Sequence, residues 1–206
     1  MKGLVFYKEL LSRKDLSLTS RCLWSWLISE VVKAYDGGIS DLCKYLDGRD
    51  GVVRVVGVDS GVRPLALGIS KATYLRKMSE LRDAGVFVDG MLSCLSSVVS
   101  GGFFELRADG RFLSVEEMVL YGWYYDRCLF SNASYIWVAN AFAADVFGVS
   151  AESIRRYKVH MNSVGLLDYR KEDGVFYTGV PALHSKLGGR IRKYTNKVKT
   201  IKVDFE

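Results

Sequence analysis

One pattern of residues occurs twice in this chain, and this repeat limits the fold more than any other feature of the sequence. Residues 67–70 are Leu-Gly-Ile-Ser and residues 147–150 are Phe-Gly-Val-Ser. In each copy a glycine follows the serine at the same distance, at Gly85 and Gly165, so the second copy lies 80 positions after the first. A repeated segment of this kind indicates that one structural unit occurs twice.

A second repeated segment precedes each copy. Leu-Ser at 16–17 is followed by Leu-Trp-Ser-Trp at 23–26, and Leu-Ser at 113–114 is followed by Leu-Tyr-Gly-Trp at 120–123. These upstream segments lie 97 positions apart, so the first unit has about 17 residues more than the second. A β-branched run between turn residues supplies them, and we expect a β-hairpin inserted into the first unit at about residues 48–64.

The size and composition of the chain agree with two small units. A chain of 206 residues, 49% of them hydrophobic, can form two units of about 100 residues that each bury a core. We expect a first unit over residues 1–108, a second over 109–185 and a basic tail over 186–206. No apolar run is long enough to span a membrane, and no signal peptide follows Met1. The four cysteines match no metal-ligand spacing, so we expect a cytoplasmic protein with reduced cysteines, no metal and no other cofactor.

Capping residues divide each unit into helices. Ser17 and Ser40 are the expected N-caps of two helices in the first unit. In the second unit Ser114 and Glu117 have the spacing of a capping box, and Gly148 supplies a left-handed residue that ends a later helix. The helices expected from these signals cover about residues 18–35, 41–46, 115–128 and 131–147, the last passing through Trp137.

A further helix begins after each repeated serine and leads into a hairpin. Ser70 and Ser150 are its expected N-caps. An Asp-Gly pair, the strongest short hairpin signal, follows at residues 89–90 and 173–174. The residues expected on the inner side of the two helices are Tyr74, Met78 and Leu81 in the first copy and Ile154, Tyr157 and Met161 in the second. The expected fold is mainly α with small β-hairpins (α+β), arranged as two tandem winged helix-turn-helix domains in which each hairpin is the wing.

These residues resemble known DNA-binding families. The Ser-capped helix, the apolar residue eleven positions on, the glycine and the apolar strand resemble the winged-helix signature, twice between residues 16 and 180. Residues 6–11, Phe-Tyr-Lys-Glu-Leu-Leu, the Leu-Ser-Leu at 16–18 and the Leu-Trp at 23–24 resemble the N-terminal winged helix of plasmid and phage replication initiators and replisome organisers. The inserted hairpin and the Trp24/Trp26 pair depart from that pattern. The resemblance implies double-stranded DNA as the partner.

The charge of the chain points in the same direction. Its formal net charge is +6, and a basic protein of this kind suits a polyanion such as nucleic acid. In a helix-turn-helix the third helix enters the major groove. The residues expected to contact DNA from it are Ser70, Lys71, Thr73, Arg76 and Lys77 in the first copy, and Ser150, Glu152, Ser153, Arg155, Arg156 and Lys158 in the second. The sequence leaves open which of them contact bases and which contact phosphates.

The two wings differ in character. Arg170 and Lys171 on the second wing are candidate phosphate or minor-groove contacts. The first wing is apolar, with Met91, Leu92, Cys94, Leu95, Val98 and Val99 after its turn. A wing of this kind suits packing on the second unit or across a homodimer, and Arg49, Arg54 and Arg63 of the insertion would then replace it in contacting DNA.

The basic tail is expected to add to the DNA contacts. It is either a free polybasic arm or one edge strand over Lys197–Phe205, where Lys alternates with apolar residues. In both cases Arg190, Arg192 and Lys193 form its DNA-facing part.

Catalytic chemistry is not indicated. The chain has two histidines, His160 and His184, and neither has a carboxylate and nucleophile at a recognisable spacing. No nucleotide-binding, nucleophile-elbow or zinc motif is present, and no small-molecule substrate is evident. We therefore expect a sequence-specific DNA-binding protein and no enzyme, either a replication initiator or an accessory regulator of a plasmid, phage or integrated element. The alternatives are a transcriptional regulator of the same fold and a tandem winged-helix scaffold that binds protein, of the kleisin-associated type.

Overall fold

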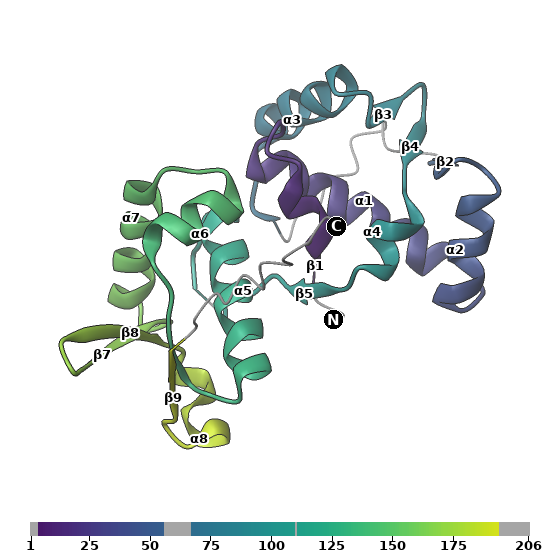
Figure 1. The fold of residues 1–206 in the computed structure, drawn as a ribbon. Helices are drawn as coiled ribbons and strands as arrows, with labels where there is room; N and C mark the ends of the chain where they lie inside the picture. The colour runs from purple at the N-terminus through teal and green to yellow at the C-terminus, as the bar shows by residue number, and fades with distance from the viewer. Residues whose placement is uncertain (1–3, 56–66, 110, 194–206) are drawn as a thin grey trace, which may run out of the picture.

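The computed structural model describes residues 4–55, 67–109 and 111–193. Within these residues the fold is α+β, with helices and small sheets in both halves of the chain (Figure 1). The N-terminal half, purple to teal, lies beside the C-terminal half, green to yellow, and the two meet at helices α1 (Leu18–Ala34) and α5 (Val115–Ser131). None of the helices in the described ranges is long and apolar enough to cross a membrane.

The N-terminal half places α1 among short strands and helices. Ser17 caps α1 by accepting a hydrogen bond from the Ser20 amide, as predicted. The next helix begins earlier than predicted, because the amides of Asp41 and Leu42 donate to the Gly38 carbonyl, which makes Gly38 the N-cap in place of Ser40. The other elements of this half are β1 (Val5–Tyr7), η1 (Lys8–Ser12), α2 (Ile39–Asp47), β2 (Val52–Arg54), α3 (Lys71–Asp83), β3 (Phe87–Val88), β4 (Met91–Ser93), α4 (Ser96–Ser100) and β5 (Phe103–Glu105).

The C-terminal half follows a similar order. The predicted capping box of Ser114 and Glu117 is present at the start of α5, and Asn132 ends this helix with a φ of 49°. After α5 come β6 (Tyr135–Trp137), α6 (Asn140–Phe147), α7 (Ala151–Ser163), β7 (Asp168–Glu172), β8 (Val175–Gly179), η4 (Pro181–Leu183), α8 (His184–Leu187) and β9 (Ile191–Lys193).

The strand β6 corrects the sequence prediction of one helix over residues 131–147. Residues 135–137 form the third strand of a four-stranded sheet with the order β7-β8-β6-β9. Ile136 is fully buried and pairs with Thr178 of β8 and, in parallel, with Arg192 of β9. An aromatic and β-branched triplet suits a buried strand, and its three residues were too short to show the alternation of a strand in the sequence.

The helix bounds show where the two halves correspond. Helices α1 and α5 each have 17 residues and begin 97 positions apart, at 18 and 115. Helices α3 and α7 each have 13 residues and begin 80 positions apart, at 71 and 151. The repeat predicted from the sequence is therefore a repeat of secondary structure.

The extra residues of the first half lie elsewhere than predicted. From the start of α1 to β2 the chain runs from residue 18 to 52, against 115 to 135 for α5 to β6, so most of the difference is the segment that contains α2. Within the described residues, strand β2 pairs with β4 in the sheet β2-β4-β3. The other part of the hairpin predicted at 48–64, residues 56–64 with Arg63, lies outside the described residues.

Both predicted Asp-Gly turns form hairpins. Asp89 and Gly90 join β3 to β4, and Asp173 and Gly174 join β7 to β8. All four residues have positive φ, between 49° and 76°, which is the conformation of a type I′ turn. The sequence signal fixed both the turn type and the pairing of the strands.

The apolar residues of the β3–β4 hairpin and of the segment after it mostly belong to the core of their own half. Leu92, Cys94, Val98 and Val99 are buried. The Trp24 indole of α1 donates a hydrogen bond to the Ser93 carbonyl, which fixes the hairpin to α1. Val88, Met91 and Leu95 keep 48%, 38% and 44% of their surface exposed. The apolar sequence of this hairpin is therefore explained largely by packing within the chain.

The four cysteines are free thiols, as predicted. Burial raises the pKa of Cys94 to about 11 and that of Cys128 to about 12, so these two thiols carry little thiolate near neutral pH.

The start of the predicted tail is part of the C-terminal fold. Leu187 is buried, and residues 191–193 form β9 along the parallel edge of β6. A boundary at residue 186 would thus remove one strand and a core residue. The edge strand predicted at Lys197–Phe205 lies outside the described residues.

Candidate nucleic-acid interface

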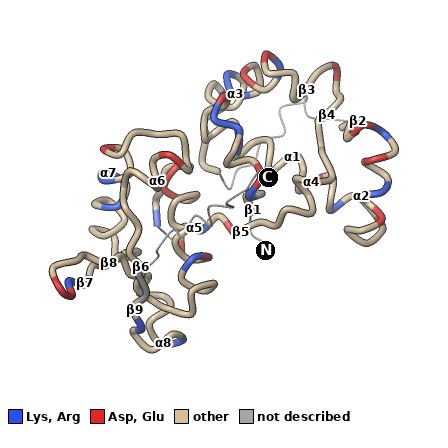
Figure 2. The backbone as a smooth tube through the Cα atoms, viewed as in Figure 1, with Lys and Arg blue, Asp and Glu red and all other residues tan. Residues whose placement is uncertain are grey.

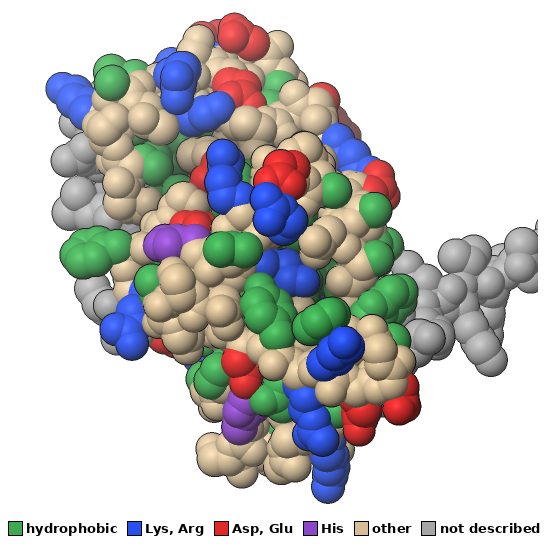
Figure 3. Space-filling model, turned by 90° about the vertical axis from the view of Figure 1, so that its left-hand side faces the viewer, with side chains coloured by type: hydrophobic (Ala, Val, Ile, Leu, Met, Phe, Trp, Pro, Cys, Tyr) green, Lys and Arg blue, Asp and Glu red, His purple; other side chains and the backbone are tan. Residues whose placement is uncertain are grey.

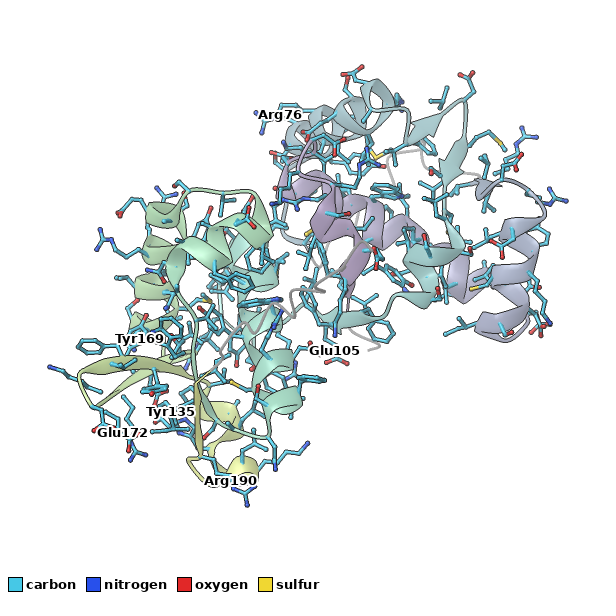
Figure 4. All side chains as sticks on the ribbon, in the orientation of Figure 1. Arg76, Glu105, Tyr135, Tyr169, Glu172 and Arg190 are labelled. Atoms are coloured by element: carbon cyan, nitrogen blue, oxygen red, sulfur yellow. The ribbon has the colours of Figure 1, made fainter. Side chains whose placement is uncertain are left out.

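Helix α3 presents one outer face made of a few side chains. Ser70 caps the helix, as predicted, by accepting a hydrogen bond from the Thr73 amide, and its hydroxyl also donates to the Thr73 side chain. Lys71, Leu75 and Arg76 are exposed, and Arg76 points away from the body of the molecule in Figure 4. No hydrogen bond or ion pair joins Arg76 to another side chain within the described ranges, so its guanidinium is available to a ligand.

Lys77 was predicted to face DNA, and the structure corrects this. Its ammonium group donates hydrogen bonds to Glu80 and to the hydroxyl of Ser17, the N-cap of α1, each at 2.7 Å. The Lys77 side chain is only 16% exposed. Burial raises the pKa of Glu80, but hydrogen bonds from Lys77, from the Ser17 amide and from nearby hydroxyls outweigh it and bring the pKa to about 2. Lys77 is therefore a contact between α3 and α1.

Helix α7 presents the equivalent face in the C-terminal half. Ser150 caps it through the Ser153 amide, as predicted. Arg155 and Glu152 form a two-point ion pair with nitrogen-to-oxygen distances of 2.8 and 2.6 Å, and both side chains are more than half exposed. The guanidinium of Arg156, also exposed, lies 5.6 Å from the ring centre of Tyr157.

Lys158 does not belong to this face, against the prediction. Its ammonium group donates to the Asn140 side chain at 3.2 Å and lies 5.7 Å from the ring centres of both Tyr124 and Tyr169. Burial lowers the pKa of Lys158 to about 8. The residue therefore joins α7 to α5, α6 and β7.

A carboxylate joins α3 to α1 and α7 to α5 at equivalent positions, but it belongs to α3 in the first half and to α5 in the second. In the N-terminal half Glu80 of α3 accepts from the Ser17 amide at the start of α1. In the C-terminal half Glu117 of α5 accepts from the Ser114 amide and bonds to Nδ1 of His160 on α7 at 2.7 Å. His160 stands 80 positions after Glu80, so the same tie is made with the carboxylate on the other helix.

The sequence prediction missed two exposed apolar positions on these faces. Leu75 of α3 is 52% exposed and Val159 of α7 is 56% exposed. Leu75 directly follows the buried Tyr74, and Val159 lies two residues before the buried Met161. Steps of one and two residues turn a side chain about 100° and 200° around a helix, so both positions could have been found from the buried ones. An apolar side chain on such a face can contact a thymine methyl group.

The β7–β8 hairpin carries the predicted basic residues on its surface. Arg170 and Lys171 are exposed, and the Lys171 ammonium lies 5.5 Å from the ring centre of Phe176, which is 63% exposed. Arg170 also lies near Glu172, at 3.9 Å. This hairpin combines cations with an exposed aromatic ring at its tip.

The predicted tail contacts are separate from α3. Arg190 is exposed, but it lies at the end of the molecule opposite to Arg76 in Figure 4. Arg192 and Lys193 belong to β9. The structure therefore does not bring Arg190 together with the α3 residues.

Charge on the candidate surfaces is mixed. Lys and Arg occur on α3, α7 and the β7–β8 hairpin, and Asp and Glu stand among them (Figure 2). Figure 3 shows the side of the molecule that carries α7 and the β7–β8 hairpin, where basic side chains are interspersed with hydrophobic and acidic ones. Such a surface offers separate contacts to a polyanion and no single continuous basic patch.

The described residues hold no group of three or more His, Cys, Asp or Glu side chains that could bind a metal ion. Comparison with protein-family models, with curated proteins and with solved structures found no match.

Proposed function

We propose that this protein binds double-stranded DNA in a sequence-specific manner through two tandem winged helix-turn-helix units. The biological role that we propose is that of a replication initiator or accessory regulator of a plasmid, phage or integrated element.

The order of elements supports the winged-helix proposal. The C-terminal half runs helix, strand, helix, helix and hairpin, with the strand β6 pairing beside the hairpin β7–β8. The N-terminal half has the strand β2, the helix α3 and the hairpin β3–β4 in the same relation, with α2 as an addition. In this fold the helix before the hairpin enters the major groove.

The observation that carries the proposal is the pair of equivalent helices α3 and α7. Each begins at a serine cap and exposes an arginine at the same position, Arg76 and Arg156. An exposed arginine on such a helix suits the two acceptors of guanine or a phosphate. An exposed arginine at the same position of both helices favours a ligand with two similar parts.

Selection from a random DNA library tests the proposal directly. We expect recovery of a common motif, bound at submicromolar concentration at moderate salt and in the presence of random competitor. Arg76→Ala together with Arg156→Ala should abolish the preference, whereas Arg111→Ala, an exposed control outside both helices, should leave it unchanged. No enrichment, or equal binding of all sequences by the unmodified protein, would refute specific recognition.

The replication role rests on the resemblance of residues 6–24 to initiator domains. A plasmid without an origin, given this reading frame and its flanking DNA, should replicate if the protein is an initiator. If it fails to replicate and a reporter behind the selected motif responds to the protein, a transcriptional regulator is the better assignment.

The scaffold alternative makes an opposite prediction. The scaffold alternative relied on the apolar residues of the first hairpin as a protein-binding surface, but most of those residues are buried within the chain. Weak retention on heparin together with a protein that co-purifies in equal amount would favour the scaffold over DNA binding.

A further inference from the structure

Equivalent residues of the two halves touch each other. In the antiparallel β1–β5 ladder Phe6 pairs with Phe104 and Tyr7 with Phe103, and the rings of Phe6 and Phe104 stack with centres 5.3 Å apart. With the 97-residue spacing, Phe103 is the counterpart of Phe6 and Phe104 is the counterpart of Tyr7, so each residue pairs with the counterpart of the other. The Thr19 hydroxyl of α1 donates to the Glu116 carboxylate of α5 at 2.7 Å, and these residues hold the same position in the two helices, 97 apart. Contact between equivalent positions is the mark of a two-fold symmetric interface, in which each side presents the same patch.

A second pair of equivalent residues supports this local two-fold relation. Ser25 of α1 accepts from the Tyr7 amide and donates to the Val5 carbonyl, so β1 packs on α1. Gly122, at the same position of α5, packs so close to the Glu105 carbonyl of β5 that any side chain would overlap it. The β1–β5 ribbon is thus held between corresponding points of the two helices.

The two-fold relation places α3 and α7 on the same side of the molecule. In Figure 1 they flank the junction of α1 and α5 at the upper left, and the hairpins β3–β4 and β7–β8 lie farther out, one on each side. Dimeric helix-turn-helix proteins present their recognition helices in this way to inverted half-sites. Here one chain supplies both helices.

A buried arginine fixes the second helix to the first half. Arg21 of α1 is 1% exposed, and its guanidinium donates to the carbonyl oxygens of Leu11 and Phe147. No carboxylate accepts a hydrogen bond from it, and its Nε has no partner among the described residues. Phe147 is the last residue of α6, and only Gly148 and Val149 separate it from the cap of α7. Arg21 therefore holds the turn that sets the direction of α7.

The same end of α1 also holds α3. Lys77 and Glu80 of α3 both bond to Ser17, one turn before Arg21. Residues 17–21 therefore touch the anchoring contacts of both candidate recognition helices, and their relative position is set within one turn of α1.

We infer that one chain binds an imperfect inverted repeat, with α3 on one half-site and α7 on the other, and that Arg21 is the positioning residue that sets the spacing between the half-sites. This inference rests on the proposed DNA-binding function. The repeat is imperfect because the two outer faces differ, Leu75 on α3 standing where Arg155 stands on α7.

The selected DNA gives the first test. We expect two related half-sites in inverted orientation and one chain bound per duplex. Insertion of about 5 base pairs between the half-sites should weaken binding roughly 10- to 100-fold, because it turns one half-site to the opposite side of the duplex. Specific binding to direct repeats, to a single half-site, or by two chains would overturn the inference and leave the proposed function standing. Absence of any specific binding would refute the proposed function itself.

The second test needs no DNA. Spin labels at Ser79→Cys and Val159→Cys, equivalent exposed positions on α3 and α7, are placed in a Cys43→Ser background because Cys43 is partly exposed. We expect one narrow distance distribution, which Arg21→Met broadens and the exposed control Arg111→Met does not. Arg21→Lys, which keeps the charge with fewer donors, should broaden it less and serves if Arg21→Met does not fold. An unchanged distribution in the Arg21 variants would overturn the positioning role.

Discussion

Replacing Lys158 with methionine should stabilise the protein at neutral pH, although it removes a cation from a candidate DNA-binding helix. The pKa of Lys158 falls from 10.5 to about 8 on folding, because burial disfavours the charged form. A shift of that size corresponds to about 3 kcal/mol of destabilisation while the lysine is charged. Loss of the Asn140 hydrogen bond and of the two tyrosine contacts offsets part of this gain, so Lys158→Met should raise the free energy of unfolding at pH 7 by about 1 to 3 kcal/mol.

The pH dependence identifies the cause. Because the pKa of Lys158 is lower in the folded state, the unfolded chain binds more protons between pH 8 and 10.5, and wild-type stability rises there relative to the variant. The advantage of the variant should shrink by about 1.4 kcal/mol for each pH unit above 8. Urea unfolding followed by tryptophan fluorescence at pH 7, 8, 9 and 10 measures it, with Lys186→Met as the exposed control. A variant less stable than wild type at pH 7, or a difference that does not change up to pH 10, would refute the burial argument.

Three further predictions concern the helices α3 and α7. Arg76→Ala or Arg156→Ala should each weaken binding to the selected DNA by about 1 to 3 kcal/mol, measured by fluorescence anisotropy, with little change in Tm. A large fall in Tm with unchanged binding would show that the inner and outer faces of the helix are assigned the wrong way round. Glu80→Gln should lower the free energy of unfolding at pH 7 by about 1 to 3 kcal/mol. Because the pKa of Glu80 is about 2 in the folded state and 4.5 ordinarily, this loss should be complete above pH 4.5 and disappear as the pH falls toward 2. A loss of equal size at pH 7 and pH 2.5 would contradict the prediction. Replacing the thymine under Leu75 with deoxyuridine should weaken wild-type binding about fourfold, because it removes one buried methyl group. The same replacement should not change the affinity of the Leu75→Ala variant. If no such replacement in the site weakens wild-type binding, the contact is excluded.

The sequence contained the features that depend on local chemistry. The serine caps at 17, 70, 114 and 150, the capping box with Glu117 and the two Asp-Gly turns all act over three or four residues, and the structure has each of them. The 80-residue and 97-residue spacings of the repeat were also visible, because the same local signals occur twice.

The features that failed depend on partners distant in the sequence. Residues 135–137 form a strand because β8 and β9 lie on either side of them, more than 40 residues later in the chain. Helical periodicity placed Lys77 and Lys158 near the edge of their faces, but it could not show that Ser17 covers one and that Tyr124 and Tyr169 cover the other. The candidate DNA surface is for this reason smaller than predicted, with Lys71, Arg76, Arg155 and Arg156 as its exposed cations on the two helices.

The pairing of the strands determines that the two halves can fold at different points during synthesis of the chain. Strand β1 finds its partner β5 once residue 105 has left the ribosome, so the first half can close while the second is still being made. The second half must wait for β9, because β6 lacks one of its two neighbours until residue 193 is available. Until residue 147 has left the ribosome, the Arg21 guanidinium has only water in place of the Phe147 carbonyl, and the nascent chain carries α3 without α7.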